Sequence, residues 1–165
     1  MANQYNVLFL CTDNSARSIM AEALLNHKGR GTFKAYSGGI QPAKVVHPQA
    51  LEELTLAGIG TQDLRSKSWD EFSPQGDVSS MDFIFMLCDR NEICPSWPHS
   101  PTANWHIPDP IAKVHSSEEI GRGFHEAFTL LDSHINLLLA LQDSELVQMA
   151  LEQKGERSRP PRTVC

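Results

Sequence analysis

The chain has 165 residues, of which 41% are hydrophobic, which suits one domain with a buried core and argues against a second full domain. Its formal net charge is −6, so it lacks the surplus of Lys and Arg that binding to nucleic-acid phosphates requires. The N-terminal segment has no basic region, its apolar run is short, and no segment approaches the length of a membrane span. We therefore expect a cytoplasmic protein with neither a nucleic-acid nor a membrane partner.

The first half of the chain alternates apolar strand patterns with helical ones. Residues 7–10 (VLFL) form a continuous apolar run, as in a strand covered on both faces, and residues 19–24 then repeat apolar side chains with helical spacing. Residues 32–37 alternate like a second strand. Pro48 is suited to the first turn of a helix, and Gly58 marks its end.

The second half contains another apolar strand, a proline-rich segment and a long helix. Residues 66–72 (SKSWDEF) predict a short helix, and residues 83–87 are fully apolar. Prolines between residues 94 and 110 exclude long regular structure there, apart from a short strand at 104–107. Ser116 and Glu119 form a capping-box pattern that begins a long helix. The helical spacing of apolar residues weakens from residue 144, where the sequence predicts at most a short helix. We expect residues 155–165 to be disordered.

Apolar strands that alternate with helices predict an α/β fold, with a parallel sheet covered by helices on both sides. We expect one domain over residues 1–142 and a partly disordered C-terminal extension over residues 143–165. Ligands bind such sheets beyond the carboxyl ends of the strands. Because Cys11 and Cys88 each follow an apolar strand, the fold would bring both to the same edge.

Residues 11–18 (CTDNSARS), which we call the anion loop, connect the first strand to the first helix. Backbone N–H groups of such a loop converge at the helix N-terminus and can cradle a tetrahedral oxyanion. Arg17 would donate two hydrogen bonds to two oxygens of the anion. The positive field of the helix N-terminus and of Arg17 is expected to lower the pKa of Cys11. Ser18 is placed to donate a hydrogen bond to the sulfur. The candidate substrate-binding residues are Thr12, Asp13, Asn14, Ser15, Ala16, Arg17 and Ser18.

A thiolate below a bound oxyanion is a nucleophile for attack on phosphorus or arsenic, and the departing oxygen needs a proton. Asp109 is our candidate acid, because Pro108 and Pro110 fix the backbone on either side of it. Taken alone, an Asp between prolines is more often part of a turn than a catalytic acid. The alternative interpretation of Cys11 is an inert thiol in the core. The strand, the loop, the helix and the downstream Asp-Pro together favour catalysis.

The four cysteines are too few and too unevenly spaced for a disulfide scaffold. Cys88 and Cys94, together with His99 and His106, fit no standard zinc spacing, so we expect no metal site. Two interpretations of Cys88 and Cys94 therefore stay open: they are either inert thiols in the core or redox-active thiols.

The segments VLFLCTDNSARSIMAEALL and TANWHIPDP resemble the low-molecular-weight phosphotyrosine phosphatase superfamily, and LCDRNEICPSWPHSP with AYSGGI resembles its arsenate reductase branch. The resemblance covers about residues 6–141 and implies a three-layer fold, a four-stranded parallel sheet flanked by helices. It implies Cys11 as nucleophile, Arg17 as oxyanion binder, Ser18 as thiolate stabiliser, Asp109 as general acid and Asn14 as the loop-shaping residue. Asp13 stands where the family's loop usually has glycine. A carboxylate there either points outward or weakens anion binding by like-charge repulsion.

The resemblance also implies a thiol relay. In the arsenate reductases a second cysteine, matched by Cys88, attacks the cysteine–arsenic adduct, and a third, matched by Cys94, resolves the disulfide. Two thiols supply the two electrons that convert arsenate to arsenite. Whether Cys88 or Cys94 is the first to react with Cys11 stays open. No cofactor is bound, and an external thiol reductant is implied: thioredoxin, glutaredoxin with glutathione, or mycothiol.

The expected function is therefore arsenate reduction in arsenic detoxification, with arsenate as substrate, phosphate as a competing oxyanion and a thioredoxin-like protein as partner. One alternative is a phosphatase for phosphotyrosine or a small phosphoester, which would use Cys11, Arg17 and Asp109 alone. A second alternative is a non-catalytic regulator that binds oxyanions.

Overall fold

The structure is a computed structural model that describes residues 4–72, 81–88, 102–111 and 116–157. Its centre is a four-stranded sheet in the order β2-β1-β3-β4, in which all neighbouring strands are parallel. The strands are β1 (Tyr5–Cys11), β2 (Phe33–Gly39), β3 (Phe83–Met86) and β4 (Ala103–Asn104). The predicted α/β class with a four-stranded parallel sheet is confirmed. Cys94 lies outside the described residues.

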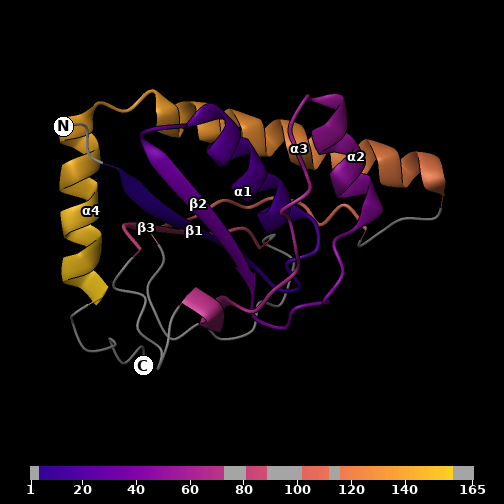
Figure 1. Cartoon of the computed structure of the whole chain (residues 1–165), viewed down its shortest axis with the longest axis horizontal. Helices are drawn as coiled ribbons and strands as arrows, with labels where there is room; N and C mark the ends of the chain where they lie inside the picture. The colour runs from indigo at the N-terminus through magenta and orange to yellow at the C-terminus, as the bar shows by residue number, and fades with distance from the viewer. Residues whose placement is uncertain (1–3, 73–80, 89–101, 112–115, 158–165) are drawn as a thin grey trace.

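Successive side chains of β1 pack into two different apolar clusters, because they point to opposite faces of the sheet. Val7 and Phe9 join the larger cluster, to which all four α-helices contribute, and Leu8 and Leu10 join the smaller one. The helices are α1 (Arg17–Lys28), α2 (Pro48–Leu56), α3 (Ser117–Leu139) and α4 (Asp143–Arg157). Figure 1 shows α3 along the top of the molecule and α4 at its left edge.

The second face of the sheet carries the smaller apolar cluster. Trp69 and Phe72 pack against its apolar cluster, and they belong to η1 (Trp69–Phe72), a single turn of 3-10 helix. Among the residues that the structure describes, no α-helix contributes buried side chains to this cluster. In the part of the chain that the structure describes, η1 therefore contributes to the cover of this face.

Helix α3 begins as its capping pattern predicts. The Ser116 Oγ accepts a hydrogen bond from the Glu119 backbone N–H at 3.2 Å, which satisfies one of the free amides of the first turn. The predicted apolar stripe forms the buried side of the helix. Its buried members are Phe124, Ala127, Leu131, Ile135 and Leu138.

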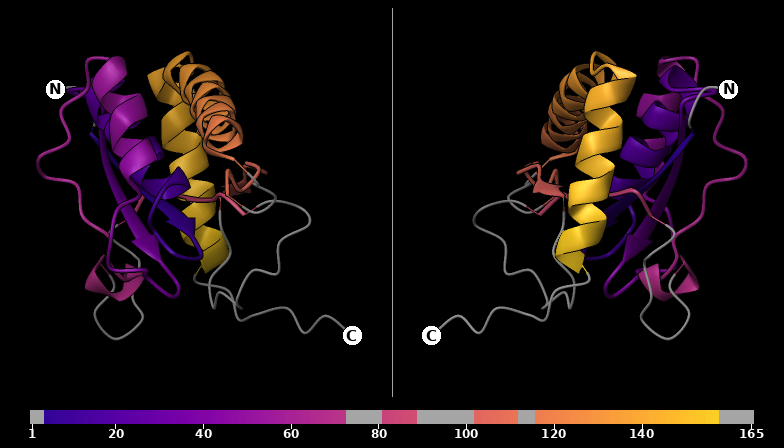
Figure 2. Two further views of the ribbon diagram at one scale, coloured as in Figure 1. Left: turned by 90° about the vertical axis from the view of Figure 1, so that its right-hand side faces the viewer. Right: turned by 90° about the vertical axis from the view of Figure 1, so that its left-hand side faces the viewer.

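Helix α4 is longer than the faint sequence signal indicates, and its last residues, 155–157, fall in the segment predicted to be disordered. Leu146 and Ala150 are buried in the larger cluster, and the Tyr5 hydroxyl donates to Asp143 Oδ1 at 3.0 Å. Packing against the rest of the fold therefore stabilises a helix whose own sequence is mostly polar. Figure 2 shows α3 and α4 together on one side of the molecule.

In its described part, residues 102–111, the proline-rich segment forms a two-residue strand, β4, which begins one residue earlier than the strand predicted at 104–107. The Trp105 N–H still donates to Met86 O at 2.8 Å, and its ring stacks on Phe85 with 4.3 Å between centroids. This packing holds residues 107–111 beside the carboxyl edge of the sheet. No helix in the described part of the chain combines the length and the apolar character needed to cross a membrane.

Candidate active site

The anion loop leaves the carboxyl end of β1 and turns sharply into α1. Asn14 has a φ of 49°, in the left-handed region that asparagine tolerates better than most residues. Its side-chain amide donates to Ser18 Oγ at 2.7 Å, and its carbonyl oxygen accepts from the Lys67 N–H at 2.8 Å. Asn14 therefore connects Ser18 of the anion loop to the backbone of Lys67. The close approach of β2 needs Gly39, because a Cβ there would lie 2.9 Å from the Asn14 Cβ.

The Cys11 sulfur is fully buried but lies among polar groups of the anion loop. Its Sγ is 2.9 Å from Ser18 Oγ and accepts a hydrogen bond from the Asn14 N–H at 3.2 Å. Burial raises the pKa of the Cys11 thiol, and the guanidinium of Arg17 and the hydroxyl of Ser18 only partly offset that effect. The predicted lowering of this pKa is therefore wrong, because a linear pattern does not show how completely the sulfur is desolvated.

We expect alkylation of native Cys11 by iodoacetamide to accelerate with rising pH, with a midpoint above the ordinary thiol pKa. The reason is that the thiolate is the reacting form and burial disfavours it. Mass spectrometry of the peptide that contains Cys11 would follow the rate, and the urea-unfolded chain, whose thiol is solvated, is the control. A midpoint near neutral pH in the native protein would contradict the direction of the shift.

Arg17 ties the anion loop to the carboxyl edge of the sheet. Its side chain is buried, and Nη1 donates to the carbonyl oxygens of Leu87 at 3.2 Å and Ile107 at 3.1 Å. Its Nη2 lies 4.0 Å from Asp109 Oδ2. Asp109 is 30% exposed, and its Oδ1 accepts the Ile111 N–H at 3.1 Å. The structure thus brings the candidate oxyanion binder and the candidate acid together.

Cys88 follows β3 at the same edge of the sheet as Cys11, but the two side chains pack in different apolar clusters on opposite faces. Cys11 is a free thiol, whereas Cys88 is disulfide-bonded. The Cys88 carbonyl oxygen lies 3.3 Å from His106 Nδ1. Because Cys94 lies outside the described residues, a bond between Cys88 and Cys94 stays a prediction.

Sequence reasoning missed a buried ion pair behind the anion loop. Lys67 Nζ lies 3.5 Å from Glu22 Oε2 and 3.1 Å from Ser37 Oγ, and their side chains come from different parts of the fold. Ser37 Oγ donates to the same Glu22 oxygen at 2.9 Å. Burial raises the pKa of Glu22 and lowers the pKa of Lys67. No local motif identifies this cluster, because α1, β2 and the segment before η1 meet only in the folded chain.

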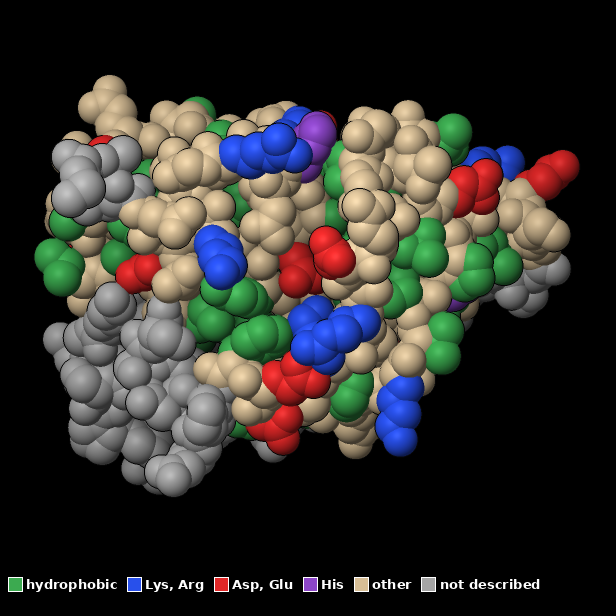
Figure 3. All heavy atoms as spheres, viewed as in Figure 1, with side chains coloured by type: hydrophobic (Ala, Val, Ile, Leu, Met, Phe, Trp, Pro, Cys, Tyr) green, Lys and Arg blue, Asp and Glu red, His purple; other side chains and the backbone are tan. Residues whose placement is uncertain are grey.

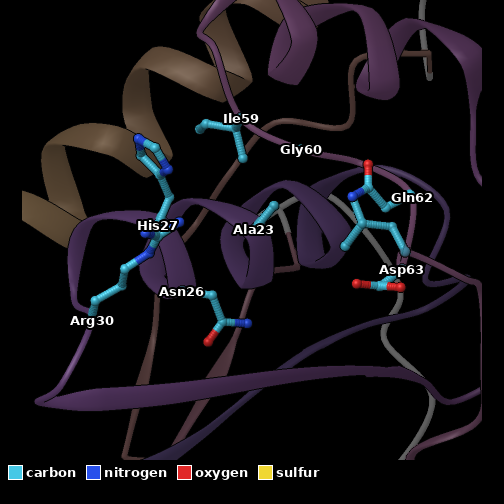
Figure 4. Close-up of a pocket in the computed structure, with 9 residues that line it drawn as sticks. Ala23, Asn26, His27, Arg30, Ile59, Gly60, Gln62 and Asp63 are labelled. Carbon is cyan, nitrogen blue, oxygen red and sulfur yellow. The ribbon is translucent and has the colours of Figure 1, made fainter.

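The face drawn in Figure 3 carries charges of both signs. On the face drawn in Figure 3, the described Lys and Arg side chains are interspersed with Asp and Glu. A separate pocket beside α1, shown in Figure 4, is lined by residues that include Asn26, His27, Arg30 and Asp63, and no residue of the anion loop lines it. This pocket is therefore distinct from the anion loop.

Comparison with known proteins shows the family of the chain. A model of the low-molecular-weight phosphotyrosine protein phosphatase family matches residues 6–149. An arsenate reductase of Bacillus cereus is 33% identical, covering 73% of this chain and 92% of that protein, and one of Brevibacillus brevis is 33% identical, covering 68% and 82%. The crystal structure of an Archaeoglobus fulgidus arsenate reductase aligns with a TM-score of 0.60 and 27% identity, covering 79% of this chain and 98% of that one. The chain therefore belongs to the low-molecular-weight phosphotyrosine protein phosphatase family, as an enzyme of the arsenate reductase or phosphatase type.

Proposed function

We propose that the protein reduces arsenate to arsenite with Cys11 as nucleophile. The observation that carries the proposal is the Cys11 sulfur, held by Ser18 Oγ and the Asn14 N–H inside the anion loop. The buried Arg17 of this loop donates to the Leu87 carbonyl, and Cys88 lies at the same edge of the sheet. A phosphatase needs only water to regenerate its cysteine, so a second cysteine at this edge favours the reductase. The names of the relatives from Bacillus and Brevibacillus support the same choice.

The first step joins sulfur to arsenic. Because burial raises the pKa of Cys11, its proton must leave as the substrate arrives, and an oxygen of the hydrogen arsenate dianion can accept it. The thiolate then attacks arsenic while Arg17 and the loop amides bind the oxygens. One hydroxyl leaves as water with a proton from Asp109. The product is a thioester of arsenic acid on Cys11, and arsenic is still pentavalent.

The second step transfers two electrons. The disulfide of Cys88 must first be reduced, which an external dithiol of the thioredoxin type can do. The Cys88 thiolate then attacks the Cys11 sulfur, the sulfur–arsenic bond breaks with its electron pair on arsenic, and arsenite leaves. Cys94 then attacks Cys88, which frees Cys11, and an external dithiol of the thioredoxin type reduces the resulting disulfide. Because the Cys11 and Cys88 side chains pack on opposite faces of the sheet, the segment that carries Cys88 must rearrange in this step.

The proposal is tested by adding arsenate to the purified chain with thioredoxin, thioredoxin reductase and NADPH, and following NADPH oxidation. We expect turnover in the wild type and none in Cys88→Ser. In the same two proteins, hydrolysis of p-nitrophenyl phosphate that is rapid and survives Cys88→Ser would favour the phosphatase. Failure to reduce arsenate with thioredoxin, glutaredoxin or mycothiol systems would contradict the proposal, and oxyanion binding without any turnover would favour a regulator.

Glycine at one position of α3 allows the Asp109 segment to pack closely. A Cβ at Gly123 would lie 2.8 Å from the Pro110 carbonyl oxygen, whereas a Cβ at Gly121 would meet nothing within 4 Å. We expect Gly123→Ala to displace Asp109 and to lower kcat for arsenate by about tenfold or more, as loss of a positioned acid does. Gly121→Ala is the matched control, expected to keep kcat and to stabilise the helix by up to about 1 kcal/mol. Equal kcat values in the two variants would contradict this assignment.

A further inference from the structure

The carboxylate of Asp13 is turned into the anion loop rather than outward. Its Oδ1 accepts a hydrogen bond from the Ser15 N–H at 3.3 Å and lies 3.8 Å from the Cys11 Sγ. The backbone of Asp13 is held as well, because its carbonyl oxygen accepts from the Ala43 N–H at 2.8 Å and from Ser66 Oγ at 3.3 Å. Of the two orientations that the sequence left open, the structure has the inward one.

This position places a negative acceptor where an oxyanion must bind. The Ser15 N–H is one of the loop amides suited to an oxyanion, and Asp13 already uses it. Asp13 Oδ1 lies 3.8 Å from the attacking sulfur and uses the amide of Ser15, so we infer that one oxygen of a bound anion faces this carboxylate. An anion oxygen without hydrogen is repelled by a carboxylate, whereas a hydroxyl group donates a hydrogen bond to it.

Building on the function proposed above, we propose that Asp13 makes the anion loop selective for oxyanions that carry a hydroxyl group. Hydrogen arsenate and hydrogen phosphate have such a group, and sulfate has none. Aryl phosphate dianions have none either, so the same residue would disfavour phosphotyrosine. Sites built to hydrogen-bond a ligand hydroxyl reject analogues without it strongly, because a buried polar group is then left facing a group it cannot pair with.

Hydrogen phosphate and sulfate allow this selectivity to be separated from simple charge repulsion. At about pH 8, inorganic phosphate is mainly a dianion with one hydroxyl group, and sulfate is a dianion with none. Arg17 and the loop amides attract both anions, so a difference between the two reports on the oxygen that faces Asp13. A loop glycine, which the family usually has at this position, would offer no such acceptor.

The experiment is calorimetric titration of the full chain with phosphate and with sulfate at constant ionic strength and about pH 8. We expect wild type to bind phosphate at least about tenfold more tightly than sulfate. Asp13→Asn and Asp13→Gly are each expected to reduce this ratio by about tenfold or more, mainly by strengthening sulfate binding. Asp63→Asn, which removes one carboxylate from the separate pocket of Figure 4, is the charge-matched control and should leave the ratio unchanged.

Equal affinity of the wild type for the two anions would overturn the inference, and so would a ratio that neither Asp13 variant changes. A change in Asp13→Gly alone would assign the effect to the loop backbone and would also overturn it. These results are independent of turnover. Selective binding without arsenate reduction would leave the inference standing and remove the proposed function, whereas arsenate reduction without selective binding would do the reverse.

Discussion

Replacing Arg17 by lysine is expected to lower kcat/KM for arsenate by about a hundredfold to a thousandfold, the usual loss when one preorganised oxyanion donor is removed. The buried guanidinium donates to two backbone carbonyls, those of Leu87 and Ile107, and its planar fork can bind oxyanion oxygens at the same time. A lysine ammonium keeps the charge but not this geometry. Steady-state kinetics measure the effect.

Arg30→Lys is the matched control for this substitution. Arg30 is exposed beyond the other end of α1 and lines the separate pocket of Figure 4, so the same chemical change there should leave kcat/KM unaltered. Calorimetric titration with phosphate adds a second readout, because Arg17→Lys should also weaken oxyanion binding. If Arg17→Lys kept wild-type kcat/KM and phosphate affinity, the assigned role of the guanidinium would be wrong.

Replacing Lys67 by methionine is expected to reduce the free energy of unfolding by about 3–5 kcal/mol, because it leaves the Glu22 carboxylate buried without its cation. The Lys67 and Glu22 side chains are 6% and 13% exposed, so solvent does little to compensate. Urea unfolding at neutral pH measures the loss. The double variant Lys67→Met with Glu22→Gln should regain most of it, since the glutamine oxygen can still accept from Ser37 Oγ.

The pH dependence of the single variant provides an independent check. Burial already raises the pKa of Glu22, and removal of Lys67 takes away the largest influence that lowers it. A carboxyl whose folded pKa lies above its unfolded value favours folding at acid pH, and this contribution is lost as pH rises toward the folded pKa. The stability deficit of Lys67→Met should therefore shrink on acidification. A deficit that is absent at neutral pH, or equal in the single and double variants, would contradict the ion-pair account.

Local patterns were sufficient for most of the fold and for the strand, loop and helix around Cys11. The apolar run at 7–10 and the small polar residues after Cys11 predict a strand, a loop and a helix, because periodicity and turn chemistry act between near neighbours. The capping pair Ser116 and Glu119 marks the start of α3 for the same reason. Arg17 and Asp109 lie 4.0 Å apart, near the place where Pro108 and Pro110 were expected to hold the Asp109 side chain.

Other properties depended on neighbours that are distant in the sequence. The pKa of Cys11 rises because the folded chain desolvates it completely, and Asp13 turns inward because Ser15, Ala43 and Ser66 hold its two ends. The helical structure of residues 155–157 comes at the end of a helix that packs on the core, although their own signal is weak. Burial and charge pairing depend on all the groups that surround a side chain in the folded protein. A linear motif can therefore indicate candidate residues, but their pKa values and positions are decided by the tertiary structure.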